Sequence, residues 1–231
     1  MEILKAINVE KVYNSKNEEL SVHALTGIDL SVMKGDFMVI AGASGSGKTT
    51  LLNILGTLDI PTKGEVFLEG DNLSKFSSKE LSEIRLNKMG FIFQAFNLIP
   101  VLTALENIEF TMMLRNIPEK TRHEKAIALM AELGIDELKD KRPNQMSGGQ
   151  QQRVAVARAI VNEPLICLAD EPTANLDSKT SSNLLDLMQR LNEDKNITFI
   201  FSSHDNQIKE RAKRLIYLKD GKIESENGKS V

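Results

Sequence analysis

The stretch FMVIAGASGSGKTTLLNIL, residues 37–55, decides the fold of this 231-residue chain. Its first part, Phe37–Ala41, is continuously apolar and runs into glycine, which is typical of a strand buried on both faces of a mainly parallel sheet. The residues after Lys48 continue as an apolar helix. Between the two, Gly42–Thr49 fits the pattern G-x-x-x-x-G-K-[ST] in the strand–loop–helix context that a phosphate-binding loop requires. We therefore predict an α/β fold that binds a phosphate-bearing ligand.

The chemistry of such a loop follows from its residue types. Glycines let successive backbone N–H groups turn toward phosphate oxygens, and the start of the following helix adds its partial positive charge. Lys48 is expected to reach the β- and γ-phosphates and the Thr49 hydroxyl to ligate Mg²⁺. A glycine-rich turn that matches by chance is the alternative, which the flanking strand and helix disfavour. The loop residues expected to bind ATP are Gly42, Ala43, Ser44, Gly45, Ser46, Gly47, Lys48, Thr49 and Thr50.

Two acids follow a second apolar run. Leu165–Ala169 is followed by Asp170, Glu171 and Pro172. An acid at the carboxyl end of a buried parallel strand lies at the sheet edge where α/β folds bind ligands. We expect Asp170 to hold Mg²⁺ through its water shell and Glu171 to orient or polarise the attacking water. Without the phosphate loop, a plain strand–turn boundary would be the better interpretation.

A third motif, Ser147-Gly148-Gly149-Gln150, precedes a predicted helix. Ser147 and Gln150 stand in capping-box spacing, so one interpretation is a well-formed helix start and nothing more. The other is a second phosphate-binding surface of exposed N–H groups and a hydroxyl. Because one loop already serves one nucleotide, we expect two copies arranged head to tail, each offering this motif to the nucleotide of the other.

Composition excludes several classes of protein. With 29 Lys and Arg against 32 Asp and Glu, the formal net charge is −3, and the basic residues are scattered, which disfavours nucleic acid as a partner. The single cysteine, Cys167, excludes an intrachain disulfide framework and indicates a reducing, cytosolic compartment. We expect no signal peptide at Met1–Lys5, and the uncharged stretch Met89–Leu105 is too short and too polar to span a membrane.

The remaining pattern alternates strands with helices, which predicts a mainly parallel sheet. Two β runs at the start, Ile3–Val12 and Val22–Val32, indicate an antiparallel part. We predict one domain, with residues of about 1–89 and 164–231 as the nucleotide-binding core and about 90–163 as an inserted helical subdomain. Further strands are expected at 64–68, 89–93, 197–201, 214–218 and 222–224, and further helices at 105–114, 122–133, 150–161, 178–191 and 205–212.

These motifs together resemble the nucleotide-binding subunits of ATP-binding cassette (ABC) transporters. The resemblance extends from about residue 3 to residue 224. It is carried by Gly42–Thr49, Gln94, Met146–Gln150, Leu165–Glu171, Asn175–Asp177 and His204 in order and spacing. It implies the ABC ATPase fold and ATP hydrolysis with ATP and Mg²⁺ bound between two cassettes. It also implies a homodimer on ATP binding, an integral membrane permease as partner, and a cytoplasmic protein peripheral on the inner face of the membrane.

Four further residues receive their roles from the resemblance. Tyr13 looks like the aromatic that stacks on adenine, and Gln94 like the glutamine that contacts Mg²⁺ and water and senses the membrane subunit. Asp177 looks like the residue that couples the two sites, and His204 like the histidine at the γ-phosphate, which joins Glu171 and Lys48 as a catalytic residue. Read alone, Tyr13 would be a core aromatic, His204 a surface histidine and Asp177 the N-cap of a helix.

Within the family, Gly90–Pro100 and Leu102–Asn107 resemble the lipoprotein-releasing and macrolide-efflux branch, the LolD/MacB type. The resemblance implies export, efflux or lipoprotein release. Candidates for a groove that receives a helix of the permease are Phe96, Leu98, Met112 and Met113, with core packing as the alternative. Ala43 and Met146 depart from the usual proline and leucine but keep size and apolarity, so we expect activity to be retained.

Two other functions remain to be weighed. A soluble cassette ATPase acting on nucleic acid or ribosomes would carry two cassettes, long coiled-coil insertions or basic arms, and this chain shows one cassette with no such block. A nucleotide-sensing regulatory module is disfavoured because Glu171 and His204 are both present.

Overall fold

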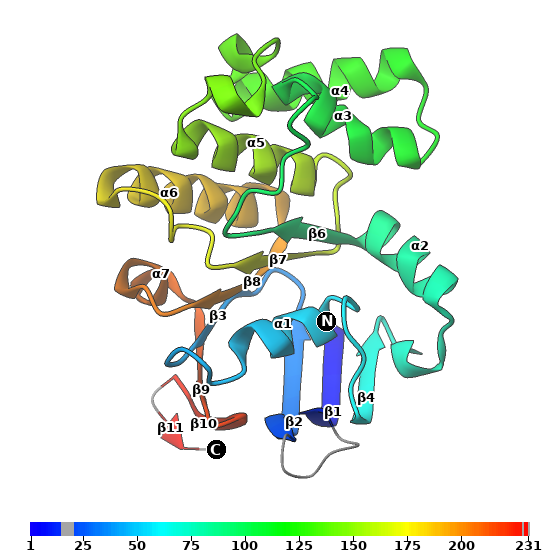
Figure 1. Ribbon diagram of the computed structural model, residues 1–231, viewed down its shortest axis with the longest axis vertical. Coiled ribbons are helices and arrows are strands. Elements are labelled where there is room, and N and C mark those ends of the chain that lie inside the picture. Colours follow the sequence, from blue (N-terminus) through cyan, green and yellow to red (C-terminus); the bar gives the residue numbers. More distant parts are fainter. Residues whose placement is uncertain (15–20, 228, 231) are drawn as a thin grey trace. The chain divides into compact units, whose positions relative to one another are not determined.

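The computed structural model describes residues 1–14, 21–227 and 229–230, and the chain forms two compact units (Figure 1). The first unit comprises Met1–Arg85 and Thr198–Val231, and the second comprises Leu86–Ile197. The predicted boundaries near residues 90 and 163 separate a nucleotide-binding core from a helical subdomain. They describe a different division from these two compact units, and they stay a prediction.

An antiparallel sheet opens the first unit, as the two initial β runs predict. Its strand order is β2 (Val22–Met33), β1 (Glu2–Tyr13), β4 (Lys63–Leu68) and β5 (Asp71–Asn72). Ala6 of β1 stands opposite Leu30 on one side and Val66 on the other, and all three side chains are buried. Burial alternates along β1 from Leu4 to Ile7, so this part of the strand has one buried face.

The parallel part of the first unit is built around β3 (Phe37–Ala41), whose five residues are all buried. It pairs in parallel with β8 (Thr198–Ser203) and β9 (Arg214–Lys219). Strands β10 (Lys222–Glu226) and β11 (Lys229–Ser230) continue antiparallel from β9. Helix α1 (Lys48–Leu55) packs against β1, β2 and β8, and α7 (Asn206–Arg211) packs against β3. The predicted buried strand thus forms the centre of this unit.

Helix α5 (Gly148–Ile160) is the central helix of the second unit. It packs against α3 (Ala104–Leu114), α4 (Glu119–Glu132) and α6 (Ser178–Lys195), and it also contacts β6 (Met89–Ile92) (Figure 1). Strand β6 pairs in parallel with β7 (Ile166–Asp170), which confirms a parallel arrangement here too. Leu184, Leu187, Met188 and Leu191 form the buried stripe predicted for α6.

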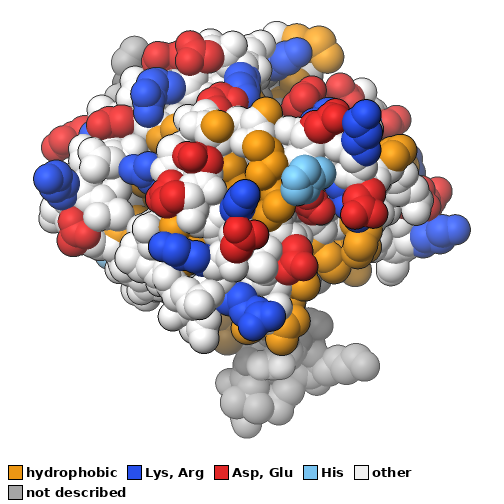
Figure 2. Space-filling view, turned by 90° about the horizontal axis from the view of Figure 1, so that it is seen from above, with side chains coloured by type: hydrophobic (Ala, Val, Ile, Leu, Met, Phe, Trp, Pro, Cys, Tyr) orange, Lys and Arg blue, Asp and Glu red, His pale blue; other side chains and the backbone are white. Residues whose placement is uncertain are grey.

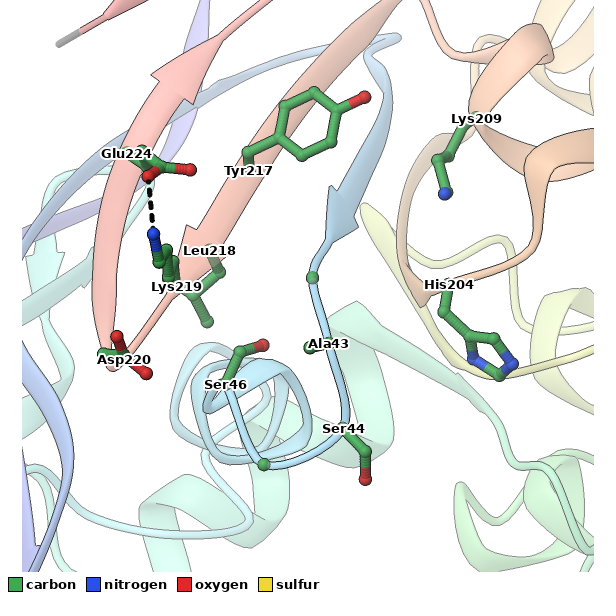
Figure 3. A pocket seen from close by; sticks show the side chains of 12 residues that line it. Ala43, Ser44, Ser46, His204, Lys209, Tyr217, Leu218, Lys219, Asp220 and Glu224 are labelled. Atoms are coloured by element: carbon green, nitrogen blue, oxygen red, sulfur yellow. Dashed lines mark hydrogen bonds and ion pairs between the residues drawn. The ribbon is translucent and has the colours of Figure 1, made fainter.

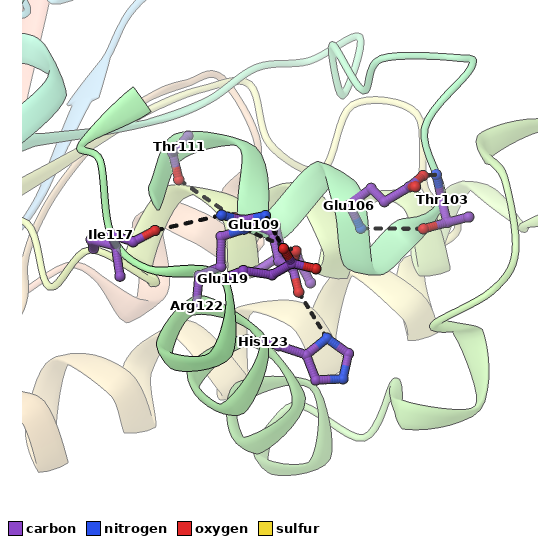
Figure 4. A network of polar contacts seen from close by, with 9 residues as sticks. Thr103, Glu106, Glu109, Thr111, Ile117, Glu119, Arg122 and His123 are labelled. Atoms are coloured by element: carbon purple, nitrogen blue, oxygen red, sulfur yellow. Dashed lines mark hydrogen bonds and ion pairs between the residues drawn. The ribbon is translucent and has the colours of Figure 1, made fainter. Parts of the chain in front are cut away.

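A partly buried carboxylate ties α3 to α4. Glu109 of α3 accepts a hydrogen bond from Arg122 Nε at 3.3 Å and lies 3.0 Å from His123 Nδ1, and both partners are on α4 (Figure 4). Arg122 also donates to the Ile117 carbonyl in the connecting loop. His123, which matches no motif, therefore has a structural contact.

Helix α2 (Ser78–Lys88) is the main element that the sequence does not predict. None of its residues is buried, so it has no apolar stripe to show as a helical period. The short 3-10 helices Leu73–Lys75, Asp136–Leu138 and Pro143–Gln145 also carry too few residues for a periodic signal. Burial of an amphipathic face is thus what made the other helices recognisable.

The surface carries charges of both signs. Figure 2 shows Lys and Arg side chains interspersed with Asp and Glu over the face seen from above, with hydrophobic side chains gathered between them. This mixture accords with the formal net charge of −3. Within the described part of the chain, no helix has the length and apolarity needed to cross a membrane.

Helix α5 lies directly on the backbone of β6. A Cβ atom built on Gly90 would stand 2.5 Å from the Ala159 carbonyl oxygen and 3.2 Å from Cys167 Sγ. Burial raises the pKa of the Cys167 thiol, which is a neutral packing group and not half of a disulfide. Only a hydrogen atom fits at residue 90.

We expect Gly90→Ala to lower the free energy of unfolding by about 1–3 kcal/mol, because the methyl group must push α5 away from β6. Denaturant unfolding measures the change. Gly148→Ala is the control, since a Cβ there would meet its nearest atoms at 3.6 Å, an ordinary contact. Equal stability of Gly90→Ala and the wild type would contradict the close approach.

Candidate active site

The loop after β3 turns tightly and requires glycine at defined positions. Gly45 and Gly47 have φ of 79° and 102°, in the left-handed region that favours glycine. A Cβ on Gly42 would stand 2.3 Å from the Leu218 carbonyl oxygen, and one on Gly47 would stand 2.5 Å from the Ala24 carbonyl oxygen. At Gly45 there is open space, so only the backbone angle demands glycine there. The pattern found in the sequence is thus a steric requirement.

The start of α1 offers donors and a cation to an anion. Gly47 is its N-cap, without a side-chain cap, and the first turn holds no acid. Lys48 is buried, and its Nζ donates to the carbonyl oxygens of Gly42 and Ala43, both at 2.9 Å. Ser46 Oγ is buried and has no hydrogen-bond partner among the described residues. These N–H groups, the ammonium and the hydroxyl fit phosphate oxygens.

His204 lies beside this loop in one pocket of about 590 Å³. The pocket is lined by residues 42–46, by His204 and Lys209, and by residues 217–220 and 224 (Figure 3). His204 follows β8 and is exposed. On the opposite wall, Lys219 forms an ion pair with Glu224 at 3.3 Å. The wall that β9 and β10 provide is absent from the sequence prediction, because no local pattern marks it.

Tyr13, at the end of β1, is 38% exposed and so is not the core aromatic that it would be if read alone. Its hydroxyl donates to Asp59 Oδ2 at 2.9 Å, and Lys11 Nζ lies 4.9 Å from its ring centroid. Burial opposes ionisation of Asp59, but hydrogen bonds from Lys11 and Tyr13 outweigh it and leave the pKa of that carboxyl below its ordinary value. Stacking of Tyr13 on adenine stays a prediction.

In the second unit, Asp170 ends β7 and Glu171 follows it, as predicted. Glu171 has φ of 45°, a left-handed conformation for a residue that is not glycine. It also precedes Pro172, and a residue before proline ordinarily adopts extended backbone. Such strain persists where the surroundings hold it, commonly at functional sites.

The Ser147 motif opens α5 with a full capping box. Ser147 Oγ accepts from the Gln150 N–H at 3.3 Å, and Gln150 Oε1 accepts from the Ser147 N–H at 2.9 Å. A Cβ on Gly149 would stand 2.4 Å from Thr180 Cγ2, so that glycine lets α5 pack against the first turn of α6. The capping interpretation is confirmed, and contact with a second nucleotide stays a prediction.

Asp177 is the N-cap of α6, as its position predicts. Its carboxylate accepts from the Lys179 and Thr180 N–H groups at 3.1 and 3.0 Å and from Thr180 Oγ1 at 2.6 Å. The hydrogen bonds from Thr180 are the main cause of a pKa below its ordinary value. Its coupling role stays a prediction.

Gln94 is exposed and lies two residues beyond β6. Asn175 Nδ2 donates to the Gln94 carbonyl oxygen at 2.9 Å, which joins this turn to the Asn175–Asp177 loop. Phe96 and Asn97 follow with φ of 59° and 50°, and both carbonyl oxygens accept from the Arg158 guanidinium.

The four candidates for the permease groove differ in exposure. Met112 is fully buried in the core of the helical region, so for this residue the alternative of core packing is correct and the docking groove is not. Met113 is half exposed, whereas Phe96 and Leu98 are of intermediate exposure.

The structure thus brings the phosphate loop and His204 into one pocket of the first unit. Gln94, Asp170, Glu171, the Ser147 motif and Asp177 belong to the second unit. Among the described residues, no three His, Cys, Asp or Glu side chains cluster to hold a metal. Thr49, Gln94 and Asp170 each carry the kind of oxygen donor that Mg²⁺ prefers, and their role as its ligands stays a prediction.

Comparison with known proteins identifies the family of this chain. The family described as ABC transporter matches residues 25–174. The lipoprotein-releasing system ATP-binding protein LolD of Aquifex aeolicus is 45% identical over 225 residues, covering 97% of each chain. The macrolide export ATP-binding/permease protein MacB of Syntrophobacter fumaroxidans is 42% identical over 230 residues, covering 99% of this chain and 32% of that protein.

A solved structure gives the same result for the fold. A dimeric ATP-binding cassette of Methanocaldococcus jannaschii, in a post-hydrolysis state bound to ADP and Pi, superposes with a TM-score of 0.89. The two chains are 42% identical, and the match covers 97% of this chain and 98% of that one. The chain belongs to the ABC transporter family, as an ATP-binding subunit and ATPase of its LolD/MacB branch. The predicted ABC ATPase fold is confirmed.

We expect Asp177→Ala to lower the thermal midpoint at pH 7, because the N–H groups at the start of α6 lose their acceptor. Since the folded pKa of Asp177 lies below the unfolded value, the stabilisation is present above the unfolded pKa and is lost as pH falls through the folded pKa. Thermal unfolding from pH 7 downward should show the gap to the wild type closing below about pH 4. Asp194→Ala, an exposed acid near the end of α6, should leave the midpoint at pH 7 unchanged.

Proposed function

We propose that the chain binds Mg-ATP between two copies arranged head to tail and couples its hydrolysis to a separate membrane permease. The observation that carries the proposal is the loop around Lys48: a glycine turn, an uncapped helix start and a buried ammonium lie together. The phosphate loop and His204 line the same pocket, which supports a γ-phosphate bound between them. The dimeric relative bound to ADP and Pi supports the two-copy arrangement.

Catalysis in this proposal rests on positioning and charge. Lys48 and the backbone N–H groups of the loop stabilise charge on the γ-phosphate, and His204 donates a hydrogen bond to it. Glu171 orients the attacking water. Ser147–Gln150 of the second copy close the site from the other side. Mg²⁺, held by Thr49, Gln94 and Asp170, would neutralise charge on the β- and γ-oxygens.

A membrane permease is the partner that the relatives favour. LolD is named for lipoprotein release and MacB for macrolide export, and MacB carries its permease in the same chain. We infer export, efflux or lipoprotein release as the class of transport, with this chain peripheral on the inner face of the membrane. The half-exposed Met113 and the turn at Phe96 are the proposed contact with the permease.

We expect Glu171→Gln to bind ATP but to lower kcat by roughly 100-fold or more, because a neutral amide orients and polarises the attacking water less well than a carboxylate. Gel filtration with ATP should show this variant as a stable dimer. A variant that stays monomeric and hydrolyses ATP at the wild-type rate would remove Glu171 from catalysis.

Replacing the loop cation should weaken nucleotide binding. We expect Lys48→Ala to raise the Kd for ATP by about 10-fold or more, since a hydrogen bond to a charged group contributes roughly 1.5–3 kcal/mol. Calorimetric titration measures the change. Lys79→Ala, an exposed lysine of α2, is the control and should bind ATP as the wild type does. Unchanged affinity in Lys48→Ala would contradict a phosphate site at this loop.

A further inference from the structure

The backbone of Glu171 adopts a conformation that its own residue type and its neighbour do not favour. Its positive φ and the proline after it are both unfavourable for a glutamate. Within the segment, the Ala174 N–H donates to the Glu171 carbonyl oxygen at 3.2 Å. That turn fixes the residues after Glu171 but leaves the carbonyl of Pro172 to be satisfied from elsewhere.

Gln152 of α5 provides that support. Its side chain is fully buried, and its Nε2 donates to the Pro172 carbonyl oxygen at 2.7 Å. Pro172 is itself buried and directly follows Glu171. The hydrogen bond therefore fixes the backbone at Pro172, the residue next to the proposed catalytic Glu171.

The amide oxygen of Gln152 indicates that this side chain does more than stabilise the fold. Among the described residues, Gln152 Oε1 has no hydrogen-bond partner, although it is buried. A buried acceptor without a partner destabilises the fold, and an apolar side chain of the same length would avoid it. Rotating the amide would place its oxygen against the Pro172 oxygen, so only the present orientation satisfies that carbonyl. The donor is the useful part of this side chain.

Gln152 also belongs to the helix that starts with the Ser147 motif. Gly148 and Gly149 lie four and three residues before it, a spacing that places them on the same face of α5. Gly149 packs against Thr180, whose N–H and hydroxyl bind Asp177. One helix thus contacts the segment after Asp170 and the first turn of α6.

We propose that Gln152 is a positioning residue that holds the Glu171 turn in its catalytic conformation from the helix of the Ser147 motif. The inference rests on the proposed role of Glu171. Gln152 touches neither nucleotide nor water in this proposal, and it acts through the Pro172 carbonyl.

The test compares kcat with ATP affinity in Gln152→Met, which keeps the length of the side chain and removes its donor. We expect kcat to fall about 10-fold, as misplaced catalytic groups commonly cause, while the Kd for ATP changes less than about 2-fold. Gln189→Met is the matched control, because Gln189 lies on the surface of α6 and binds only Glu193 among the contacts described. It should keep the wild-type kcat.

A double-mutant cycle separates positioning from a general loss of structure. In the Glu171→Gln background, Gln152→Met should change the residual rate less than about 2-fold, because the carboxylate that it positions is gone. Equal losses in both backgrounds, or a parallel loss of ATP affinity and thermal midpoint, would overturn the proposal. If Glu171→Gln itself hydrolyses ATP at the wild-type rate, the proposed function fails instead.

Gln152→Glu gives an independent measurement should the methionine variant fold poorly. A protonated carboxyl can donate to the Pro172 oxygen, and an ionised one cannot. We expect this variant to recover activity relative to the wild type as the pH falls from 8 to about 6, since burial raises the pKa of a carboxyl. A ratio that stays flat at a tenth of the wild type across this range would overturn the role of the donor.

Discussion

The close approach of backbone to backbone at the carboxyl end of β3 is the constraint on which the site in the first unit depends. Gly42 lies against the Leu218 carbonyl and Gly47 against the Ala24 carbonyl, at distances that leave no room for a Cβ. These contacts set where α1 begins and hence where its N–H groups point. They also place Lys48 over the loop carbonyls. A phosphate site arises because the glycines allow the turn, and the chemistry of Lys48 follows from that geometry.

In the second unit, two turns have unfavourable backbone angles instead of close backbone contacts. Glu171, Phe96 and Asn97 all have positive φ without being glycine. In each case a side chain of α5 binds the carbonyls nearby: Gln152 at Pro172, and Arg158 at Phe96 and Asn97. Burial lowers the pKa of Arg158, which marks the cost of placing a guanidinium there. Both strained turns are thus held by polar side chains from a single helix.

The sequence predicts most of this fold because burial leaves a periodic pattern. Phe37–Ala41 is a strand over the predicted residues, and the caps at Ser147 and Asp177 are where their residue types place them. Helix α2 has no buried face and so gives no such pattern. The chemistry of Met112 suits either a docking surface or the core, and only the fold shows that it is buried.

The sequence also predicts where several of the candidate site residues lie in the fold. Motif residues such as Lys48 and Glu171 carry local signals, and their place at strand ends follows from the parallel sheet. The pocket wall formed by Tyr217 and Lys219 joins residues far apart in the chain, so no local pattern indicates it. The left-handed turn at Glu171 contradicts the local rule for a residue before proline, and the contact of Gln152 with the next carbonyl comes from a distant part of the chain.

The missing side chain at Gly90 has a mechanical consequence. Where two elements touch through side chains, a small displacement of one is absorbed by a change of rotamer in the other. At Gly90, β6 has no side chain that could adjust in this way, and its backbone lies against the Ala159 carbonyl oxygen. Helix and strand are therefore in direct backbone contact, and α5 cannot move closer to β6 unless the backbone of one of them shifts.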